Sequence, residues 1–568
     1  MTIRRYGNLV AATLLTSFLS APAMADADVG AYLAARQAMG GGDYDVASDY
    51  FRRALISDPT NRALMENSLV AMVADGDFVS AGVIAESVIE IGQETELALI
   101  AATVNRANKG QWTKIINGLE AGLTINPFID SALQGWAALG TGDMTAALED
   151  FDAMIEDASL RSFGLYQKAL ALAFVGDFEG AEALFATLDA EGAPVNVRSA
   201  IARAQILSQL DRNDDAIAVI DALDPLGTDL ALAHVRETLA AGDSLPYTFV
   251  NDPAAGAAEA FLLISILLED EASPTYGLVY ARAAQGLAPA NSDAILRTAT
   301  LLEQIGRFEM AGEVYALVKP DDPNFLGAEL GRAEALNRAG KTETAIEVML
   351  QLSRTYTQVS FVHGTLGDYL RRDGQYERAE QAYTTALSVV PEGLQTEWFL
   401  YYTRGITRER QGKWDEAEAD FRKALELEPN RASVLNYLGY SLVERREKLD
   451  EALELIQRAV DLQPDNGAIV DSLGWVYYRL GQFEEAAPLL ERAAALEPID
   501  PIINDHLGDA FWMVGRKTEA RFQWQRALSF DPEDAEIDRI RRKLEVGLDV
   551  VLEEENATPT DTDANGNN

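Results

Sequence analysis

Three histidines are the side chains best suited to acid–base or metal chemistry in this 568-residue chain, and they lie far apart. His234, His363 and His506 form no His-Glu-x-x-His spacing, and His506 stands beside Leu507 in an apolar pattern. The chain contains no cysteine, which excludes disulfides, thiolate metal sites and thiol catalysis. We therefore expect no metal site, no cofactor site and no catalytic histidine.

The segment Ala339 to Thr342, Ala-Gly-Lys-Thr, has the residues that end a phosphate-binding loop. Ala335 stands where the first glycine of that loop must be, so the segment is not such a loop. The sequence also has no Gly-x-Ser-x-Gly motif, and its many carboxylates have no partner placed for acid–base catalysis. We expect a protein without enzyme activity.

One stretch, residues 473–498, sets a pattern that other parts of the chain repeat. Its fixed positions are Leu473, Gly474, Tyr477, Gly481, Ala486, Leu490, Ala493 and Pro498. The same set returns 34 residues later as Leu507, Gly508, Phe511, Gly515, Ala520, Trp524, Ala527 and Pro532. The small residues let two helices approach closely, the turn glycine ends the first helix, and proline stops the second. Each unit is predicted to be a helical hairpin.

This order of Leu-Gly, aromatic, Ala, aromatic, Ala and Pro resembles the tetratricopeptide repeat family. One hairpin cannot bury its own apolar face, so neighbouring hairpins must stack into a solenoid. The resemblance implies an all-α fold, a right-handed superhelix. Counting the repeats along the chain predicts about 14 hairpins, six in a first array and eight in a second.

Residues 1–25 look like a secretory signal peptide. Arg4 and Arg5 precede an apolar run from Leu9 to Leu19, and Ala23-Met24-Ala25 provides small residues for cleavage. The alternative is a membrane anchor, but spanning a bilayer takes about 20 apolar residues and this run is shorter. We expect cleavage after Ala25 and export of the mature chain.

Two repeat arrays follow the signal. The N-terminal array covers residues 26–223, and the C-terminal array covers residues 257–533. Between them, residues 224–256 hold one short helix, Asp229 to Ala240, and then an irregular connection rich in turn residues. This connection is predicted to be a hinge, an insertion into a groove, a boundary between arrays or a degenerate repeat. Ordered aromatics in it, such as Tyr247 and Phe249, would favour a functional role.

The chain ends in a predicted cap and tail. Residues 534–552 carry apolar residues at helical spacing, so we expect one helix that covers the last repeat. These apolar positions are Ile537, Ile540, Leu544, Leu548 and Val551. Residues 553–568 have almost no apolar residues and are predicted to be a disordered tail.

The first helix of each regular repeat carries residues that should face away from the core. Their spacing puts each set on one helix face, and the curvature of a solenoid turns those faces inward. The predicted groove residues are Asn436, Tyr440, Asp471, Trp475, Tyr478, Arg479, Asp505, Asp509 and Trp512. Aromatic anchors with polar rims are typical of surfaces that bind partner proteins. The alternative is that the two tryptophans merely pack against adjacent repeats.

The net charge of −43 limits the partners. The chain has 90 acidic and 47 basic residues, with the acidic excess spread along its length. Nucleic acids and anionic membranes are bound through basic patches, so neither is an expected partner. The charge keeps a long exposed chain soluble, or it provides a face for a basic partner.

We interpret the chain as a non-enzymatic scaffold, exported to the bacterial periplasm or envelope, that binds partner proteins in its groove. Residues 435–528 are similar to envelope adaptors that dock a carboxyl-terminal processing protease, which implies such a protease as one partner. Those adaptors are lipoproteins, whereas this chain has no cysteine to carry a lipid. The alternatives are a scaffold of polysaccharide secretion or outer-membrane assembly, and a non-catalytic subunit of an envelope enzyme complex.

Overall fold

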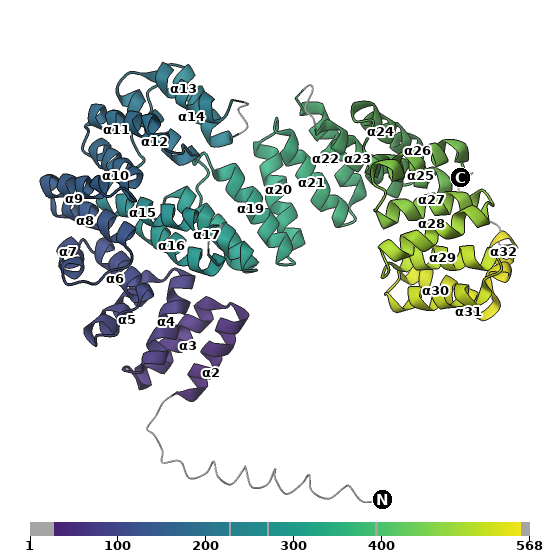
Figure 1. Ribbon diagram of the computed structural model, residues 1–568, viewed down its shortest axis with the longest axis horizontal. Coiled ribbons are helices and arrows are strands. Elements are labelled where there is room, and N and C mark those ends of the chain that lie inside the picture. Colours follow the sequence, from purple (N-terminus) through teal and green to yellow (C-terminus); the bar gives the residue numbers. More distant parts are fainter. Residues whose placement is uncertain (1–27, 226–228, 270–271, 392–395, 558–568) are drawn as a thin grey trace, which may run out of the picture. The chain divides into compact units, whose positions relative to one another are not determined.

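The computed structural model describes residues 28–225, 229–269, 272–391 and 396–557 (Figure 1). Within these ranges every regular element is a helix and no strand occurs, so the predicted all-α fold is confirmed. Contacts divide the chain into two compact units, one ending at Val348 and the other beginning at Met349, inside helix α20.

The helices of the first unit have the following bounds: α2 (Val29–Gly41), α3 (Tyr44–Ser57), α4 (Arg62–Asp75), α5 (Phe78–Glu90), α6 (Glu96–Asn108), α7 (Trp112–Glu120), α8 (Pro127–Thr141), α9 (Met144–Glu156), α10 (Arg161–Phe174), α11 (Phe178–Ala190), α12 (Val197–Gln209), α13 (Asn213–Leu223), α14 (Leu230–Ala240), α15 (Pro253–Leu267), α16 (Pro274–Leu287), α17 (Ser292–Gln304), α18 (Phe308–Tyr315), α19 (Phe325–Arg338) and the shared α20 (Thr342–Thr355). The second unit continues with α21 (Ser360–Arg372), α22 (Tyr376–Val389), α23 (Glu397–Arg410), α24 (Trp414–Leu427), α25 (Ala432–Glu444), α26 (Leu449–Leu462), α27 (Gly467–Arg479), α28 (Phe483–Leu496), α29 (Pro501–Met513), α30 (Lys517–Ser529), α31 (Asp534–Val546) and α32 (Leu548–Ala557).

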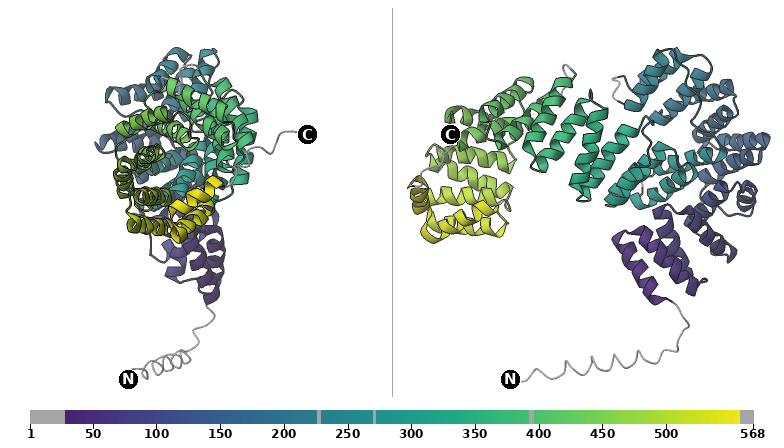
Figure 2. Two further views of the ribbon diagram at one scale, coloured as in Figure 1. Left: turned by 90° about the vertical axis from the view of Figure 1, so that its right-hand side faces the viewer. Right: turned by 180° about the vertical axis from the view of Figure 1, so that it is seen from behind.

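Successive helices pack as antiparallel hairpins that stack into a solenoid within each unit (Figure 2). In the described part of the chain, six hairpins precede α14 and eight lie between α15 and α30, as the sequence predicts. Gly481 shows how a first helix ends: its φ is 78°, and its N–H donates to the carbonyl of Tyr478 at 2.9 Å. The next N–H, of Gln482, donates to the carbonyl of Tyr477 at 2.9 Å. This paired bonding reverses the chain and starts the second helix.

One turn between the helices of a hairpin forms without glycine. Asp211 takes the left-handed conformation with a φ of 59°, and its N–H donates to the carbonyl of Ser208 at 3.1 Å. The N–H of Arg212 donates to the carbonyl of Leu207 at 3.0 Å, which repeats the pattern of the glycine turns. Aspartate tolerates this conformation better than most residues because its short polar side chain can bond locally.

Helix α15 is apolar on nearly all sides, which is typical of a helix buried within a protein. Together with α16 it lies against the first helices of the N-terminal array, α4, α6, α8 and α10 (Figures 1 and 2). The hairpin α15–α16 therefore occupies the inner face of this array, the surface that a partner would otherwise use.

Helix α6 shows how completely that face is covered. Every residue from Ala98 to Ala107 is buried, although a helix with one free face would expose about half of its positions. On the inner side, the Asn108 side chain donates to the carbonyl of Gly286 at 2.9 Å, and the hydroxyl of Tyr276 donates to Glu96 at 2.7 Å. Contacts between residues more than 170 positions apart thus fix the hairpin in place.

The connection before α15 carries the chain to this inner face. Helix α14 begins after Asp229, whose carboxylate accepts from the N–H of Leu232 at 3.0 Å, and residues 241–252 then run without regular structure. Tyr247 packs edge-on against Phe178 with centroids 6.0 Å apart, and the ring of Phe249 lies under Arg198 at 4.6 Å. The two aromatics anchor the connection to the array.

The predicted capping helix is two helices rather than one. Gly547 separates α31 from α32 with a φ of 90°, and a Cβ atom there would lie 2.5 Å from the ring of Trp512. Only glycine fits this conformation and this contact. The prediction of a tail from Glu553 is also wrong in part, because α32 continues to Ala557. The rest of the predicted tail lies outside the described residues.

The predicted signal peptide lies outside the described residues as well. Among the residues that are described, no helix combines the length and the apolar character needed to cross a bilayer.

Candidate protein-binding groove

The nine predicted groove residues lie on three first helices of the second unit. Asn436 and Tyr440 are on α25, four residues are on α27, and three are on α29. Five of the nine are buried, namely Asp471, Trp475, Asp505, Asp509 and Trp512. The other four, Asn436, Tyr440, Tyr478 and Arg479, are half-buried.

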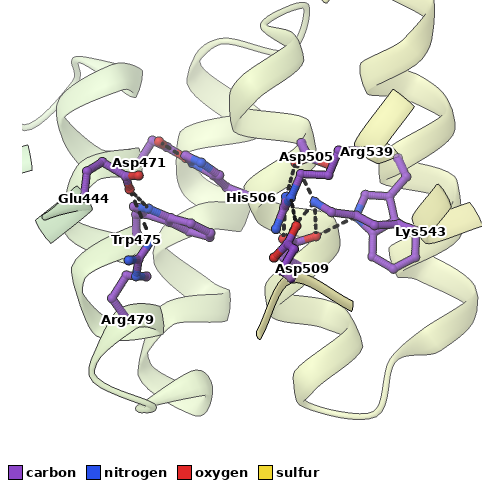
Figure 3. A network of polar contacts seen from close by, with 11 residues as sticks. Glu444, Asp471, Trp475, Arg479, Asp505, His506, Asp509, Arg539 and Lys543 are labelled. Carbon is purple, nitrogen blue, oxygen red and sulfur yellow. Dashed lines mark hydrogen bonds and ion pairs between the residues drawn. The ribbon is translucent and has the colours of Figure 1, made fainter. Parts of the chain in front are cut away.

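Helix α31 covers the residues of α29 (Figure 3). The ammonium group of Lys543 donates to Asp505 at 2.7 Å and to Asp509 at 2.8 Å, and the lysine is fully buried. Arg539 adds a second cation 3.6 Å from both carboxylates, and Asp509 also accepts from the indole of Trp524 at 2.9 Å. Two aspartates predicted to face a partner are therefore neutralised by the chain's own cap.

The residues of α27 form a second cluster with His506. The ring of Trp475 stacks between Tyr478 at 4.6 Å and His506 at 3.9 Å, and its N–H donates to Glu444 at 2.7 Å. The Nδ1 atom of His506 lies 2.9 Å from a carboxylate oxygen of Asp471. Figure 3 shows the two clusters beside each other on neighbouring repeats.

Burial and neighbouring charges shift the pKa values of Asp505 and His506. Burial raises the pKa of Asp505, and repulsion from Asp509 raises it further, while Lys543 opposes both effects. For His506 burial favours the neutral ring, but Asp471 outweighs it, so the pKa of this histidine is raised above its usual 6.5.

Trp475 and Trp512 are packed within the array rather than displayed on its surface. Their exposed fractions are 6% and 7%, because the stacked rings cover one indole and Gly547 covers the other. This placement is the alternative that the sequence left open. Replacing either indole would disturb the packing of the repeats as well as any binding. Variants of these two residues therefore cannot test binding separately from stability.

An open aromatic surface lies earlier in the second unit, on α21 and α23. Phe361 and Phe399 have exposed fractions of 46% and 40%. Each stands six residues before a glycine where the two helices of its hairpin meet, and a Cβ atom on either glycine would lie 2.6 Å from an aromatic ring. The two phenylalanines thus occupy equivalent positions of successive repeats and face the same way.

Comparison with known proteins agrees with this repeat geometry. A sequence model described as the tetratricopeptide repeat matches residues 32–92, 402–467 and 472–535. These three segments are tetratricopeptide repeats. They include α25, α29 and most of α27, and they contain eight of the nine predicted groove residues; Asp471 falls between the second and third segments.

One curated relative is a tetratricopeptide repeat-containing protein of Pseudomonas aeruginosa, PA4667. It is 28% identical over 170 residues, a match that covers 30% of this chain and 28% of the relative. The chain therefore matches less than a third of that relative's length.

Solved structures with similar folds include a tetratricopeptide repeat protein of Parabacteroides merdae, with 18% identity and a TM-score of 0.38, covering 44% of this chain and 97% of that one. Another is the Cut9–Hcn1 complex of the APC/C, with 14% identity and a TM-score of 0.37, covering 94% of this chain and 99% of that one.

Sequence reasoning missed the two residues that organise the C-terminal repeats. The sequence predicts no role for Lys543, and for His506 it predicts only the absence of a catalytic function. The helical spacing does predict that Lys543 is buried, because it falls three residues after Ile540, on the face that α31 buries. A periodic pattern does not say which acidic residues of another helix meet that face.

The raised pKa of His506 predicts how the stability of these tetratricopeptide repeats depends on pH. A raised pKa means that the folded state binds the proton more tightly, so the stabilisation is complete below about pH 6.5 and is lost as pH rises through the folded pKa. Chemical denaturation between pH 6 and 9 should show this loss, and His506→Gln should remove it. His234→Gln, on an exposed histidine of the first unit, should leave the profile unchanged. Parallel profiles of wild type and His506→Gln would contradict the assignment.

Proposed function

We propose that this protein is an exported, non-enzymatic scaffold that holds a partner protein on the open inner face of its second unit. Tetratricopeptide repeats serve as surfaces for protein–protein interaction, and the proposal places that activity on α21, α23 and α25. Export is proposed from the signal-like residues 1–25.

The exposed pair Phe361 and Phe399 carries the proposal. Two bulky aromatic side chains at equivalent positions of adjacent repeats are costly to leave in water and are typical anchors of a protein interface. Tyr402 and Ile406, half-buried on α23, extend the apolar strip. Asn436 and Tyr440, on α25, provide hydrogen-bonding groups further along the array.

An envelope protease is the proposed partner, on the strength of the resemblance of residues 435–528 to adaptors of carboxyl-terminal processing proteases. Polysaccharide-secretion or outer-membrane assembly components are the alternative that the same scaffold would serve. The identity of the captured protein distinguishes the two.

Replacing both phenylalanines by serine should abolish capture of the partner. Phe361→Ser with Phe399→Ser removes two exposed anchors, each worth about 2 kcal/mol or more of binding if it is a hot spot. Because both side chains are exposed, the fold should change in stability by only about 0.5 kcal/mol. The measurement is affinity capture of the mature chain from an envelope extract, followed by identification of the bound protein.

Phe522→Ser is the matched control, because Phe522 is 61% exposed on α30, the second helix of its hairpin. The control should capture the partner as wild type does. Equal capture by the double variant, with unchanged helical circular dichroism, would place the binding surface elsewhere.

A further inference from the structure

A cavity of about 360 Å³ lies in the first unit, and none of its lining residues belongs to the groove proposed for a protein partner. It is lined by α10, α11, α12, α15 and the loop that leads into α12. Most of its wall is apolar, with Phe163, Phe185, Leu188, Leu262 and Leu263 among the contributing side chains. This volume is within the range of pockets that bind small molecules.

The mouth of the cavity is apolar too. Val195, Ile266 and Leu267 line it and have exposed fractions of 46%, 36% and 47%. Two of them belong to α15, the helix that fills the groove of the array. Grouped apolar side chains at an opening favour entry of an apolar guest over water.

The charged groups of the cavity are already paired. Arg198 makes hydrogen bonds to Glu259 and Asp293, and Arg203 makes them to Asp189 and, at 2.9 Å, to Glu182. Two cations thus meet four carboxylates, so an anionic head group would find no free counter-ion and would be repelled. A charged guest of either sign would also lose its hydration on entry. The charges therefore disfavour an anionic guest, and the apolar wall with its desolvation cost favours an uncharged one.

Tyr166 provides one free polar group in the cavity wall. Its ring packs edge-on against Phe185 with centroids 6.1 Å apart, and its hydroxyl makes no hydrogen bond to another described residue. Burial raises the pKa of this hydroxyl, and the nearby carboxylate of Glu259 raises it further, so the group keeps its proton. A protonated hydroxyl in the cavity wall that makes no hydrogen bond within the described residues is a donor available to a guest.

We propose that this cavity binds an uncharged amphiphile, such as a fatty acyl ester, whose apolar chain fills the space between α10, α12 and α15 and whose ester oxygen accepts a hydrogen bond from Tyr166. The site would give the scaffold a small-molecule ligand in addition to its protein partner.

Displacement of a fluorescent probe tests the proposal on the mature full-length chain. N-phenyl-1-naphthylamine, an uncharged probe that brightens in apolar sites, should bind with one-to-one stoichiometry, and monolauroylglycerol should displace it. Laurate, which has the same chain and a negative charge, should displace it at least about tenfold less well, because each 1.4 kcal/mol of charge burial costs a factor of ten. Equal displacement by laurate would overturn the choice of an uncharged ligand.

Substitutions locate the site. Leu263→Trp fills the cavity and should abolish binding. If this variant does not fold, Leu267→Trp, at the exposed mouth of the cavity, is used as the blocking variant instead. Tyr166→Phe should weaken monolauroylglycerol about 2- to 10-fold, the effect of one hydrogen bond, while leaving the probe bound. Val70→Trp is the control, because Val70 lines a separate cavity of about 320 Å³ between α4 and α16.

Unchanged binding in the cavity-filling variants would overturn the proposal, as would the absence of saturable binding in wild type. If the cavity-filling variants lose a captured protein while wild type binds no amphiphile, the cavity holds a side chain of a partner protein and the proposal is wrong.

Discussion

Replacing Lys543 by methionine is expected to lower the free energy of unfolding of the C-terminal repeats by about 3–5 kcal/mol. The ammonium group is fully buried between Asp505 and Asp509, and its loss would leave two carboxylates in a low-dielectric interior with Arg539 at 3.6 Å as their ion-pair partner among the described residues. Hydrogen exchange measured by mass spectrometry should show lost protection in α29 and α31, the two helices that the lysine joins.

Lys517→Met is the matched control for this prediction. Lys517 is exposed and lies 3.3 Å from Asp549, which is exposed as well, so the change should cost at most about 0.5 kcal/mol. A triple variant, Lys543→Met with Asp505→Leu and Asp509→Leu, should recover much of the loss, because an apolar cluster can replace a buried ion pair. If Lys543→Met lowers the free energy of unfolding no more than Lys517→Met does, this lysine does not hold α31 against α29.

Replacing Gly256 by valine is expected to displace α15 from α8 and to cost about 3 kcal/mol or more. A Cβ atom at this position would lie 2.3 Å from the ring of Trp136. That ring cannot easily move, since its N–H donates to Gln167 at 2.7 Å and its edge packs on Phe151. Thermal unfolding and hydrogen exchange of α8 and α15 measure the effect.

Gly327→Ala is the control for the effect of adding a side chain to a glycine within a helix. Gly327 lies within α19, where an added Cβ atom meets nothing within 4 Å. Alanine there should stabilise the helix by about 0.5–1 kcal/mol. If Gly256→Val leaves the thermal stability as high as Gly327→Ala does, α15 does not pack closely against Trp136.

The local features of this fold follow from the sequence because short-range chemistry decides them. The turn glycines, the Asp211 turn and the helix after Asp229 each depend on residues within one or two turns of the chain. The number of hairpins follows in the same way from a repeated set of small and large residues.

The covered grooves could not be predicted in this way. A solenoid pattern assumes that each repeat contacts only its neighbours, whereas α16 meets α4 and α6 from far along the chain. One signal was present: helices α6 and α29 each contain a run of consecutive residues that are all buried, which requires cover on both faces. In the sequence, α6 reads Leu-Ala-Leu-Ile-Ala-Ala and α15 is apolar on nearly all sides, and such helices belong inside a protein.

Cover by a helix of the same chain also explains why part of the predicted groove is buried. The acidic residues on α29 are of the kind that binds partners, and they do bind a helix, but that helix is α31 of the same chain. On α27, Trp475 and Asp471 contact Glu444 and His506 of the neighbouring repeats. An interface within a chain and an interface between chains use the same chemistry, so residue types alone do not separate them. Phe361 and Phe399 are aromatic side chains that stay exposed on two first helices of the second unit.

The reactivity of one thiol on α16 tests most directly whether α15–α16 fills the inner face of the first array. Ala283 is fully buried and lies three residues from both Tyr280 and Gly286, which contact Glu96 at the start of α6 and Asn108 at its end. Because the chain has no cysteine, Ala283→Cys would carry its only thiol, and Val79→Cys, at a position 70% exposed on α5, gives the reference rate. We predict that maleimide labels Ala283→Cys at least about 100-fold more slowly than Val79→Cys in the native protein. Equal labelling rates would mean that the hairpin leaves the groove open and would contradict the account.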